Sequence, residues 1–546
     1  MFNYFSRKTL RNDILGGITA AIVSLPLALT FGVASGAGAE AGLYGAVIIG
    51  LFAAVFGGTP TLISEPTGPM TVVMAAVVTG LLANNPDNGL AMAFTVVMMA
   101  GLFQIAFGLL KLGKYITLMP YSVVSGFMSG IGVILIIIQL APALGQPAPP
   151  GGVLGTLQNL PDILSNVQLA EITLTLMTLV ILFLIPKKWT RKIPAQLIAL
   201  VGISVFSVVW FDYDSIRRIG DISMSLPTPV IPTFTLEQFR TMLVDAMVLG
   251  MLGCIDSMLT SVISDNLTRT EHKSDKELIG QGLGNLMSGF LGGLPGAGAT
   301  MGTVVNIQTG ARSAWSGVTR VITLLVGIFG FASLLGNIPL AVLAGIAVKV
   351  GVDILDWSFI KRAHRVSIHT TFIMYSVLLL TVFVDLIVAV GIGVFIANII
   401  IIEKLSVTQA KNVRAISDMD DQLPLNKEQK ALLNQANGRI LYFYLSGPMI
   451  FGVSKALARE RSSIADHDVV LIDLSDVSLL DDTMSLSIEN LIHEVREMNK
   501  AVVVIVKTEA GKQQLLRLLE EHHESLDDIL VKDRTHALQL ATDMLQ

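Results

Sequence analysis

Only 14% of the 546 residues are charged and 52% are hydrophobic, with a net charge of −5. Soluble domains carry about 25% charged residues, so this composition excludes an ordinary soluble protein, and no basic run indicates nucleic-acid binding. Charge is sparse up to about Ile402 and ordinary beyond Glu403, which predicts a membrane domain followed by a soluble tail. The single cysteine, Cys254, excludes an intramolecular disulfide framework.

Apolar windows of about 20 residues, long enough to cross a bilayer, recur along the membrane domain. The first window follows three basic residues, as in a signal peptide, but it is long and others follow at once, so we interpret it as an uncleaved span. Segments 67–82 and 299–311 are too short to cross unaided, and counting them predicts about 14 spans. The full windows are 14–34, 41–57, 92–110, 115–142, 169–186, 193–211, 241–263, 277–293, 319–335, 337–353, 369–384 and 386–402.

Lysine and arginine follow the even-numbered spans, as the positive-inside rule requires when the N-terminus is cytoplasmic. The exceptions, Arg217, Arg218 and Arg240, lie in a long loop after the seventh span, where the rule weakens. We therefore expect both termini in the cytoplasm. The residues that carry this assignment are Lys111, Lys114, Lys187, Lys188, Arg191, Lys192, Arg269, Lys273, Lys276, Arg312, Arg320, Lys361, Arg362 and Arg365.

The two short segments resemble each other. Residues 56–73 read FGGTPTLISEPTGPMTVV, and residues 291–305 read LGGLPGAGATMGTVV. Each lies third in a set of seven spans, and an odd number of spans per set gives the two sets opposite orientations. This pattern is typical of inverted repeats whose broken helices build a substrate site near the membrane midplane.

Proline and glycine in both segments disfavour helix and leave extended backbone, which is tolerated at membrane depth only inside protein or beside a water-filled cavity. Half-helices would then start near Thr67 and near Ala299. Their N-termini present free N–H groups and positive dipole ends, which favour an anion between them. The alternative is that glycine and proline only allow close packing and kinks.

A carboxylate inside an apolar stretch is costly, and Asp256 lies in one, MVLGMLGCIDSMLTSV. We interpret Asp256 as a ligand for a cation or a proton; a structural, hydrogen-bonded acid is the alternative. Glu65, just before Pro66, is the rival coupling acid, although it could instead cap the loose stretch. Asp265 belongs to a loop or an interface in this interpretation.

The stretch that starts IDSMLTSVISDN at Ile255 and continues through GGLPGAGATMGTVVNIQTGARS resembles the core signature of the SulP anion permeases, as does PTGPM at 66–70. The resemblance extends over nearly the whole chain. It implies an all-α membrane domain with a seven-plus-seven inverted repeat of the uracil-permease type, and a cytoplasmic STAS domain. Within the family, the sequence most resembles the sodium-dependent bicarbonate transporters.

One departure from the family concerns Gly302, where many SulP members have arginine. Without that fixed cation, a substrate anion and Asp256 would need a mobile counter-charge. Sodium suits oxygen ligands, and Thr260 lies one helical turn beyond Asp256. We therefore expect a sodium site formed by Asp256, Thr260, Gly298, Ala299 and Thr300, as the resemblance also implies.

The anion is expected between the two half-helix starts. Residues Ser24 and Leu27, in VSLPLALT, mirror the Asp256 helix in the first repeat and are expected to line the same cavity. Bicarbonate carries one charge, so helix dipoles without an arginine would suffice, whereas doubly charged sulfate would benefit more from the missing arginine. The predicted anion-site residues are Ser24, Leu27, Thr67, Gly68, Thr71, Ala299 and Met301.

The tail alternates strands with amphipathic helices, which predicts a small α/β unit. Residues 469–491, VVLIDLSDVSLLDDTMSLSIENL, resemble the STAS signature of anti-sigma-factor antagonists, with Asp482 where those proteins have a phosphorylatable serine. The expected strands are 439–445, 469–475 and 501–507, and the expected helices are 449–461, 482–498, 509–521 and 534–545.

The predicted domains are a transport domain (1–402, with repeats of about 1–211 and 240–402), a polar linker (403–437) and a STAS domain (438–546). The predicted function is sodium-dependent bicarbonate uptake across the plasma or inner membrane, by a homodimer to which the STAS domain contributes. No enzyme, organic cofactor or nucleic-acid partner is expected. The alternatives are a proton-coupled sulfate or dicarboxylate permease of the same fold, and a membrane-anchored STAS signalling protein.

Overall fold

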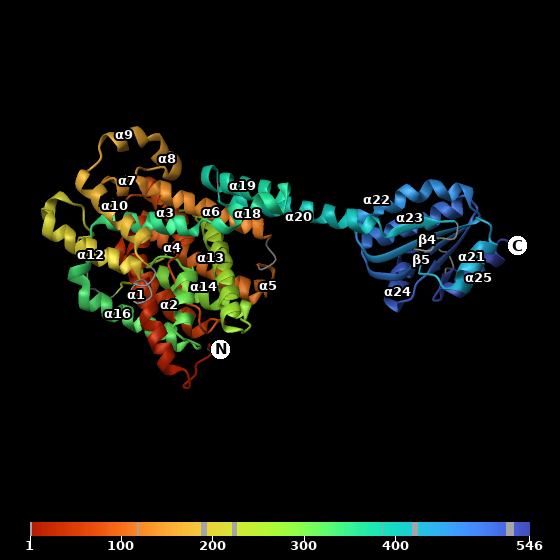
Figure 1. The fold of residues 1–546 in the computed structure, drawn as a ribbon, viewed down its shortest axis with the longest axis horizontal. Coiled ribbons are helices and arrows are strands. Elements are labelled where there is room, and N and C mark those ends of the chain that lie inside the picture. The colour runs from red at the N-terminus through yellow and green to blue at the C-terminus, as the bar shows by residue number, and fades with distance from the viewer. Residues whose placement is uncertain are drawn as a thin grey trace. The chain divides into compact units, whose positions relative to one another are not determined.

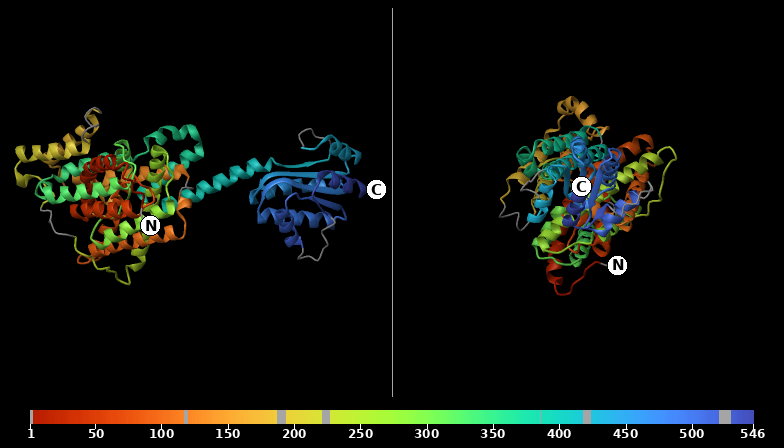
Figure 2. Two further views of the ribbon diagram at one scale, coloured as in Figure 1. Left: turned by 90° about the horizontal axis from the view of Figure 1, so that it is seen from below. Right: turned by 90° about the vertical axis from the view of Figure 1, so that its right-hand side faces the viewer.

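A computed structural model describes residues 3–116, 120–186, 194–220, 227–384, 386–417, 424–519 and 529–546. The chain forms two compact units, Met1–Phe395 and Ile396–Gln546 (Figures 1 and 2). The described residues of the first unit are mainly helical, with one short strand pair, and the second unit contains a five-stranded sheet. The predicted boundary near residue 402 falls inside a helix, α20 (Leu386–Ala410), that continues from the first unit into the second.

Each predicted membrane window of the first unit contains a helix, and so does each of the two short segments. Six helices among the described residues are long and apolar enough to cross a membrane. The main helices are α1 (Leu10–Ala34), α2 (Ala39–Phe56), α3 (Gly68–Asn84), α4 (Gly89–Leu109), α6 (Tyr121–Ile138), α10 (Leu169–Leu184), α12 (Ala195–Trp210), α13 (Phe239–Thr268), α14 (Ser274–Phe290), α15 (Thr300–Gln308), α16 (Trp315–Leu335), α17 (Leu340–Ile354), α19 (Ile368–Phe383) and α20.

Short helices join several of these elements. They are α5 (Gly113–Ile116), α7 (Leu140–Ala143), α8 (Gly152–Gln158), α9 (Leu160–Ser165), the 3-10 turn η1 (Tyr213–Ser215) and α18 (Trp357–Val366). Glycine brings the long helices close together. A Cβ atom on Gly101 of α4 would lie 2.4 Å from the backbone nitrogen of Leu286 in α14, and one on Gly282 would lie 2.6 Å from the carbonyl oxygen of Gly101. Small residues at helix contacts are a common device of membrane bundles, and here they fix α14 against α4.

The second unit is an α/β sandwich. Its strands are β3 (Val413–Ile416), β4 (Ile440–Met449), β5 (Val469–Leu480), β6 (Ala501–Ile505) and β7 (Leu530–Val531), in the order β3-β4-β5-β6-β7. Strand β3 is antiparallel to β4, and the other neighbours are parallel. Its helices are α21 (Lys427–Gln435), α22 (Ser454–Arg459), α23 (Asp482–Glu497), α24 (Glu509–Leu519) and α25 (Arg534–Asp543), and two 3-10 turns are η2 (Phe451–Val453) and η3 (Glu460–Asp466).

Each face of this sheet has its own hydrophobic cluster. Helices α22, α23 and α24 cover one face, and α21 and α25 cover the other (Figure 1). The three predicted strands correspond to β4, β5 and β6. The expected polar linker at 403–437 instead contains β3 and α21, which belong to the sheet and to its second face. The linker prediction missed them because β3 has only four residues and α21 is short and mostly polar.

Candidate functional site

The two interrupted segments meet as a strand pair. Strand β1 (Ser64–Glu65) is antiparallel to β2 (Ala297–Gly298), with Ser64 opposite Gly298 and Glu65 opposite Ala297. A further backbone hydrogen bond of 2.7 Å runs from Ala299 N–H to the Ile63 carbonyl oxygen. Segments more than 200 residues apart in the sequence therefore satisfy each other's backbone groups inside the membrane unit, as irregular backbone at that depth requires.

A half-helix starts directly after each of these strands. Helix α3 begins at Gly68 after Thr67, with Pro69 in its first turn, and α15 begins at Thr300 after Ala299. Neither start has a side-chain cap. Both therefore offer unpaired N–H groups and the positive end of a helix dipole. The strand pair brings these two starts to one place, as the sequence predicts.

Asp256 lies in the middle of α13 and is only 7% exposed. Its Oδ2 atom has no hydrogen-bond partner among the described residues, and neither has the hydroxyl of Thr67. Thr67 lies close to the Asp256 carboxylate, although the geometry falls short of a hydrogen bond. A buried carboxylate oxygen without a donor is unfavourable in free energy, and a bound cation or a proton would relieve this cost.

Three of the predicted sodium ligands contact one another, and one of them, Thr260, lies one helical turn beyond Asp256 on α13. The hydroxyl of Thr260 donates to the Gly298 carbonyl oxygen at 2.8 Å and lies 2.9 Å from the hydroxyl of Thr300. Ser257 was missed: its hydroxyl accepts a 3.0 Å hydrogen bond from Gly298 N–H. One carboxylate with several hydroxyl and carbonyl oxygens is a donor set that suits a hard cation such as sodium.

A stripe of hydroxyl side chains continues along the same face of α13. Ser261 lies 2.9 Å from the hydroxyl of Thr59, and Ser264 lies 2.8 Å from that of Thr61. Ser257, Thr260, Ser261 and Ser264 follow the i, i+3, i+4, i+7 spacing of one helix face. That spacing is visible in the sequence and predicts a polar face in an otherwise apolar helix. It fastens α13 to the first interrupted segment.

The predicted anion residues have different surroundings. Thr71 donates its hydroxyl to the Thr67 carbonyl oxygen at 2.8 Å, so this hydroxyl is already used within α3. Gly68 lies against α17, because a Cβ atom there would be 2.5 Å from Ile354 Cδ1. Ala299 and Leu27 are buried, whereas Met301 is 39% exposed and its sulfur lies 3.7 Å from the Gln196 amide nitrogen.

The assignment of Arg320 to a loop is wrong. By the positive-inside rule Arg320 is expected in a cytoplasmic loop, but it lies fully buried in α16. Its Nη2 donates to Glu65 Oε2 at 2.6 Å, and its Nε donates to the hydroxyl of Ser24 at 2.8 Å. The carbonyl oxygens of Ala46 and Ser64 accept from Nη1. Oxygen acceptors thus surround this guanidinium, which is how a charge is retained at such a position.

The contacts of Arg320 identify the hydrogen-bond partners of Ser24 and Glu65, two residues singled out from the sequence. Ser24 holds Arg320, so its hydroxyl oxygen already has a donor. Glu65 is ion-paired, whereas Oδ2 of Asp256 has no partner in the part of the chain that the structure describes. Of the two candidate coupling acids, Asp256 is therefore the one with free capacity.

Two further buried carboxylates anchor the interrupted segments and were not predicted. Glu277 of α14 accepts hydrogen bonds of 2.7 Å from the backbone N–H groups of Gly58 and Thr59. Asp13 of α1 accepts a 2.7 Å hydrogen bond from Arg312 N–H, just after α15. Each fixes the backbone next to an interrupted segment. Their spacing in the sequence carries no signal, because each partner is more than 200 residues away.

The sequence matches the sulfate permease family over residues 10–377 and the STAS domain over residues 431–526. The protein named bicarbonate transporter BicA from Synechocystis sp. is 61% identical, covering 94% of this chain and 91% of the relative. The protein of the same name from Picosynechococcus sp. is 58% identical with the same coverage. The putative sulfate transporter YvdB of Bacillus subtilis is 28% identical, covering 92% and 93%.

Solved structures also resemble this fold, among them the following two. One is the transmembrane domain of a cyanobacterium bicarbonate transporter BicA, with a TM-score of 0.69 and 63% identity, covering 71% of this chain and all of that chain. The other is SLC26A9, with a TM-score of 0.82 over 99% of this chain and 91% of that chain. At 17% identity, the second likeness concerns the fold alone.

Proposed function

We propose that this chain, which belongs to the sulfate permease family, is a membrane transporter that carries bicarbonate inward together with sodium. The family match and the two similar bicarbonate transporters support the substrate. The observation that supports sodium coupling is the buried Asp256 carboxylate. Its Oδ2 has no partner among the described residues, and one helical turn further along α13 Thr260 gathers the oxygens of Gly298 and Thr300.

The mechanism follows from the charges at the crossing of the interrupted segments. Glu65 and Arg320 cancel each other, so before ions bind, Asp256 contributes a negative charge that no ion pair among the described residues compensates. A sodium ion at Asp256, Thr260, Gly298 and Thr300 would neutralise it. The anion then adds one negative charge, which the uncapped N-termini of α3 and α15 would stabilise.

Sodium thereby makes the anion site usable. Without the cation, bicarbonate would enter a low-dielectric site next to an uncompensated carboxylate, and like charges at short distance repel strongly there. With the cation bound, the pair leaves only one net charge facing two helix dipoles. Binding order follows from this argument: sodium first, bicarbonate second, and movement across the membrane when both are present.

Uptake of labelled bicarbonate into proteoliposomes tests the substrate. With sodium outside, unlabelled bicarbonate should compete with the label, and equal concentrations of sulfate should leave uptake nearly unchanged. Sulfate transport in preference to bicarbonate would contradict the proposal. It would favour the second candidate, a sulfate or dicarboxylate permease driven by protons through Asp256. The 28% identity to a putative sulfate transporter supports this candidate.

We further propose that the protein resides in the plasma or inner membrane with both termini in the cytoplasm, and that it works as a homodimer to which the STAS domain contributes. The signalling alternative assigns the output to that domain. Deleting residues 437–546 separates the two, because a transporter retains uptake without the tail, whereas a signalling protein has no requirement for Asp256 or the interrupted helices.

A further inference from the structure

Helix α18 (Trp357–Val366) is a short basic helix between two long helices of the membrane unit, α17 and α19. It carries Lys361, Arg362 and Arg365, all exposed, and no acidic residue. His364 is exposed beside them. Three positive charges within five residues thus lie on one turn and a half of helix.

The helix is fixed in place by contacts on its other side. The Asp356 carboxylate caps it, accepting from Phe359 N–H at 3.0 Å, and also accepts from the Tyr121 hydroxyl of α6 at 2.7 Å. Phe359 and Ala363, four residues apart, are buried, and Phe359 packs edge-on against the Tyr121 ring. The basic side chains therefore face away from the bundle.

No carboxylate among the described residues neutralises these charges. Lys361, Arg362 and Arg365 form no salt bridge there, and Arg362 donates its Nε to the Ser358 carbonyl oxygen of its own helix. The nearest acids in sequence are occupied, since Asp353 pairs with Lys349 and Asp356 is the cap. The positive charge of this face is therefore available to an external partner.

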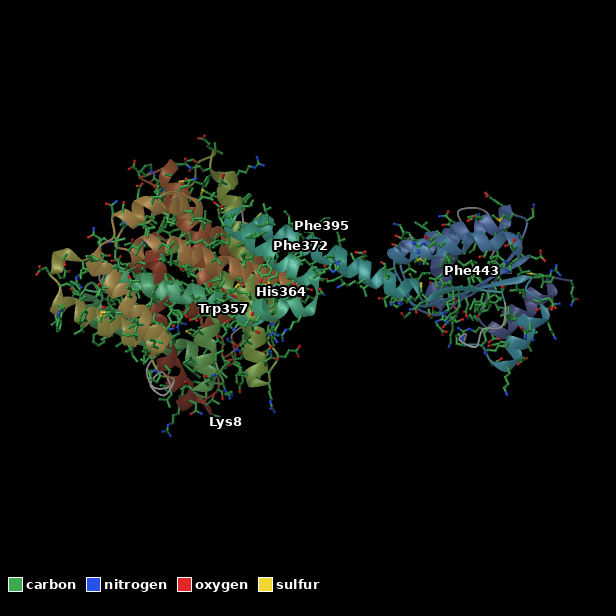
Figure 3. The ribbon with its side chains drawn as sticks, turned by 45° about the horizontal axis from the view of Figure 1, so that its top comes forward. Lys8, Trp357, His364, Phe372, Phe395 and Phe443 are labelled. Atoms are coloured by element: carbon green, nitrogen blue, oxygen red, sulfur yellow. The ribbon has the colours of Figure 1, made fainter. Side chains whose placement is uncertain are left out.

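Exposed aromatic rings flank the basic face. Trp357, at the start of α18, is 48% exposed, and Phe372, in the first half of α19, is 63% exposed. Figure 3 shows Trp357, His364 and Phe372 on the same side of the first unit. A basic helix with aromatic neighbours, between two apolar helices, is the pattern of an interfacial membrane helix.

We propose that α18 lies in the membrane interface and that Lys361, Arg362 and Arg365 bind the headgroups of anionic phospholipids. Charge complementarity selects this partner, because phosphate oxygens accept hydrogen bonds from guanidinium and ammonium groups. Each basic residue near an anionic surface contributes about fivefold in affinity, which corresponds to about 1 kcal/mol. The aromatic rings place the helix at headgroup level.

Quenching of Trp357 by brominated lipids measures this interaction on the full-length protein. Trp189→Phe, Trp210→Phe and Trp315→Phe leave Trp357 as the single tryptophan of the four in the chain. The relative binding constant is obtained from quenching by brominated phosphatidylglycerol and by brominated phosphatidylcholine in mixed vesicles. We expect a several-fold preference for phosphatidylglycerol that decreases as salt is added, because surface charges are screened.

Two triple variants that remove the same number of positive charges distinguish lipid binding by α18 from non-specific attraction between the protein and anionic lipid. Lys361→Gln, Arg362→Gln and Arg365→Gln together should abolish the preference. The control, Lys427→Gln, Lys455→Gln and Arg517→Gln, removes three exposed charges from the second unit and should retain it. The proposal would be overturned if both lipids quenched Trp357 equally in the protein with an unsubstituted α18. It would also be overturned if the preference for phosphatidylglycerol persisted in the triple α18 variant. Either result would favour an acidic protein as the partner of this face.

Discussion

Arg320 and Glu65, 255 residues apart in the sequence, are joined by a 2.6 Å hydrogen bond between Nη2 and Oε2 inside the membrane unit. Both side chains are almost completely buried, at 1% and 2% exposure. The pair ties α16 to the first interrupted segment, and through Ser24 it also reaches α1. Because the two charges cancel, they leave Asp256 as the carboxylate at this crossing with a free oxygen.

Removing one member of this pair should destabilise the fold strongly. Arg320→Gln leaves Glu65 as a buried, uncompensated charge, and such a loss typically costs about 3–5 kcal/mol. We expect a clearly lower unfolding temperature for the detergent-solubilised protein. Adding Glu65→Gln to Arg320→Gln should recover part of the loss, and Arg240→Gln, at an exposed position, should have little effect. An unfolding temperature unchanged by Arg320→Gln would refute the structural role of the pair.

The Thr260 hydroxyl should determine sodium affinity. Thr260→Val keeps the side-chain shape but removes the oxygen that contacts Gly298 and Thr300. Losing one hydrogen-bonding group at a buried site costs about 1–3 kcal/mol, so the sodium concentration for half-maximal uptake should rise about tenfold. Thr260→Ser retains the oxygen and should stay near the wild-type value. If the valine variant had the same sodium requirement as the serine variant, Thr260 would not be a ligand.

Gly296 should be required for the contact between the interrupted segments. A Cβ atom there would lie 2.4 Å from the backbone oxygen of Glu65, which is too close for any side chain. Gly296→Ala should therefore disturb the β1–β2 pairing and eliminate uptake. Gly80→Ala is the matched control, because a Cβ atom on Gly80 of α3 has no heavy atom within 4 Å. Full uptake by Gly296→Ala would show that the strand pairing is dispensable.

The tail should lose stability in acid through Asp476. Burial alone would raise the pKa of this carboxyl, but hydrogen bonds from Arg534 and Tyr444 and the charges of Arg534 and Lys507 lower the pKa below its ordinary value of 3.8. A carboxyl whose pKa is lowered on folding stabilises the fold above its unfolded pKa. This contribution is lost as the pH falls through the folded value, that is, below about 3.8.

Thermal unfolding of a fragment of residues 411–546 measures this effect. The fragment contains the whole five-stranded sheet with a hydrophobic cluster on each face. The unfolding temperature is measured at pH 5 and at pH 3, which lie on either side of the ordinary aspartate pKa. The decrease between these two pH values should be smaller for Asp476→Asn than for the unsubstituted fragment. Asp466→Asn, on an exposed aspartate, is the control. An unaltered acid transition in Asp476→Asn would contradict the assignment.

Much of the fold is predictable from hydropathy and local residue chemistry. The apolar windows predict the long helices, and the matched glycine and proline of the two short segments predict the interruptions that form β1 and β2. The half-helix start at Thr67 follows from the same residues, since proline is favoured in the first turn of a helix, where Pro69 lies. These features depend on neighbours in the sequence.

The missed features depend on distant partners. Arg320 reads as a loop charge because its four acceptors come from α1, α2 and β1, and no local pattern shows that they surround it. The same holds for Glu277, whose partners Gly58 and Thr59 are more than 200 residues away. Ser257 could have been predicted from the sequence, because the hydroxyl stripe of α13 follows helical spacing. In the tail, β3 was missed because it has only four residues, and α21 because it is short and mostly polar.

Sodium-driven uptake of labelled bicarbonate, compared between the wild type and Asp256→Asn in proteoliposomes, tests the central claim most directly. An inward sodium gradient should drive uptake by the wild type, and replacing sodium by choline outside should eliminate it. Asp256→Asn should show no stimulation by sodium, whereas Glu237→Gln, at an exposed carboxylate before α13, should behave as the wild type. Normal sodium-driven uptake by Asp256→Asn would contradict the account.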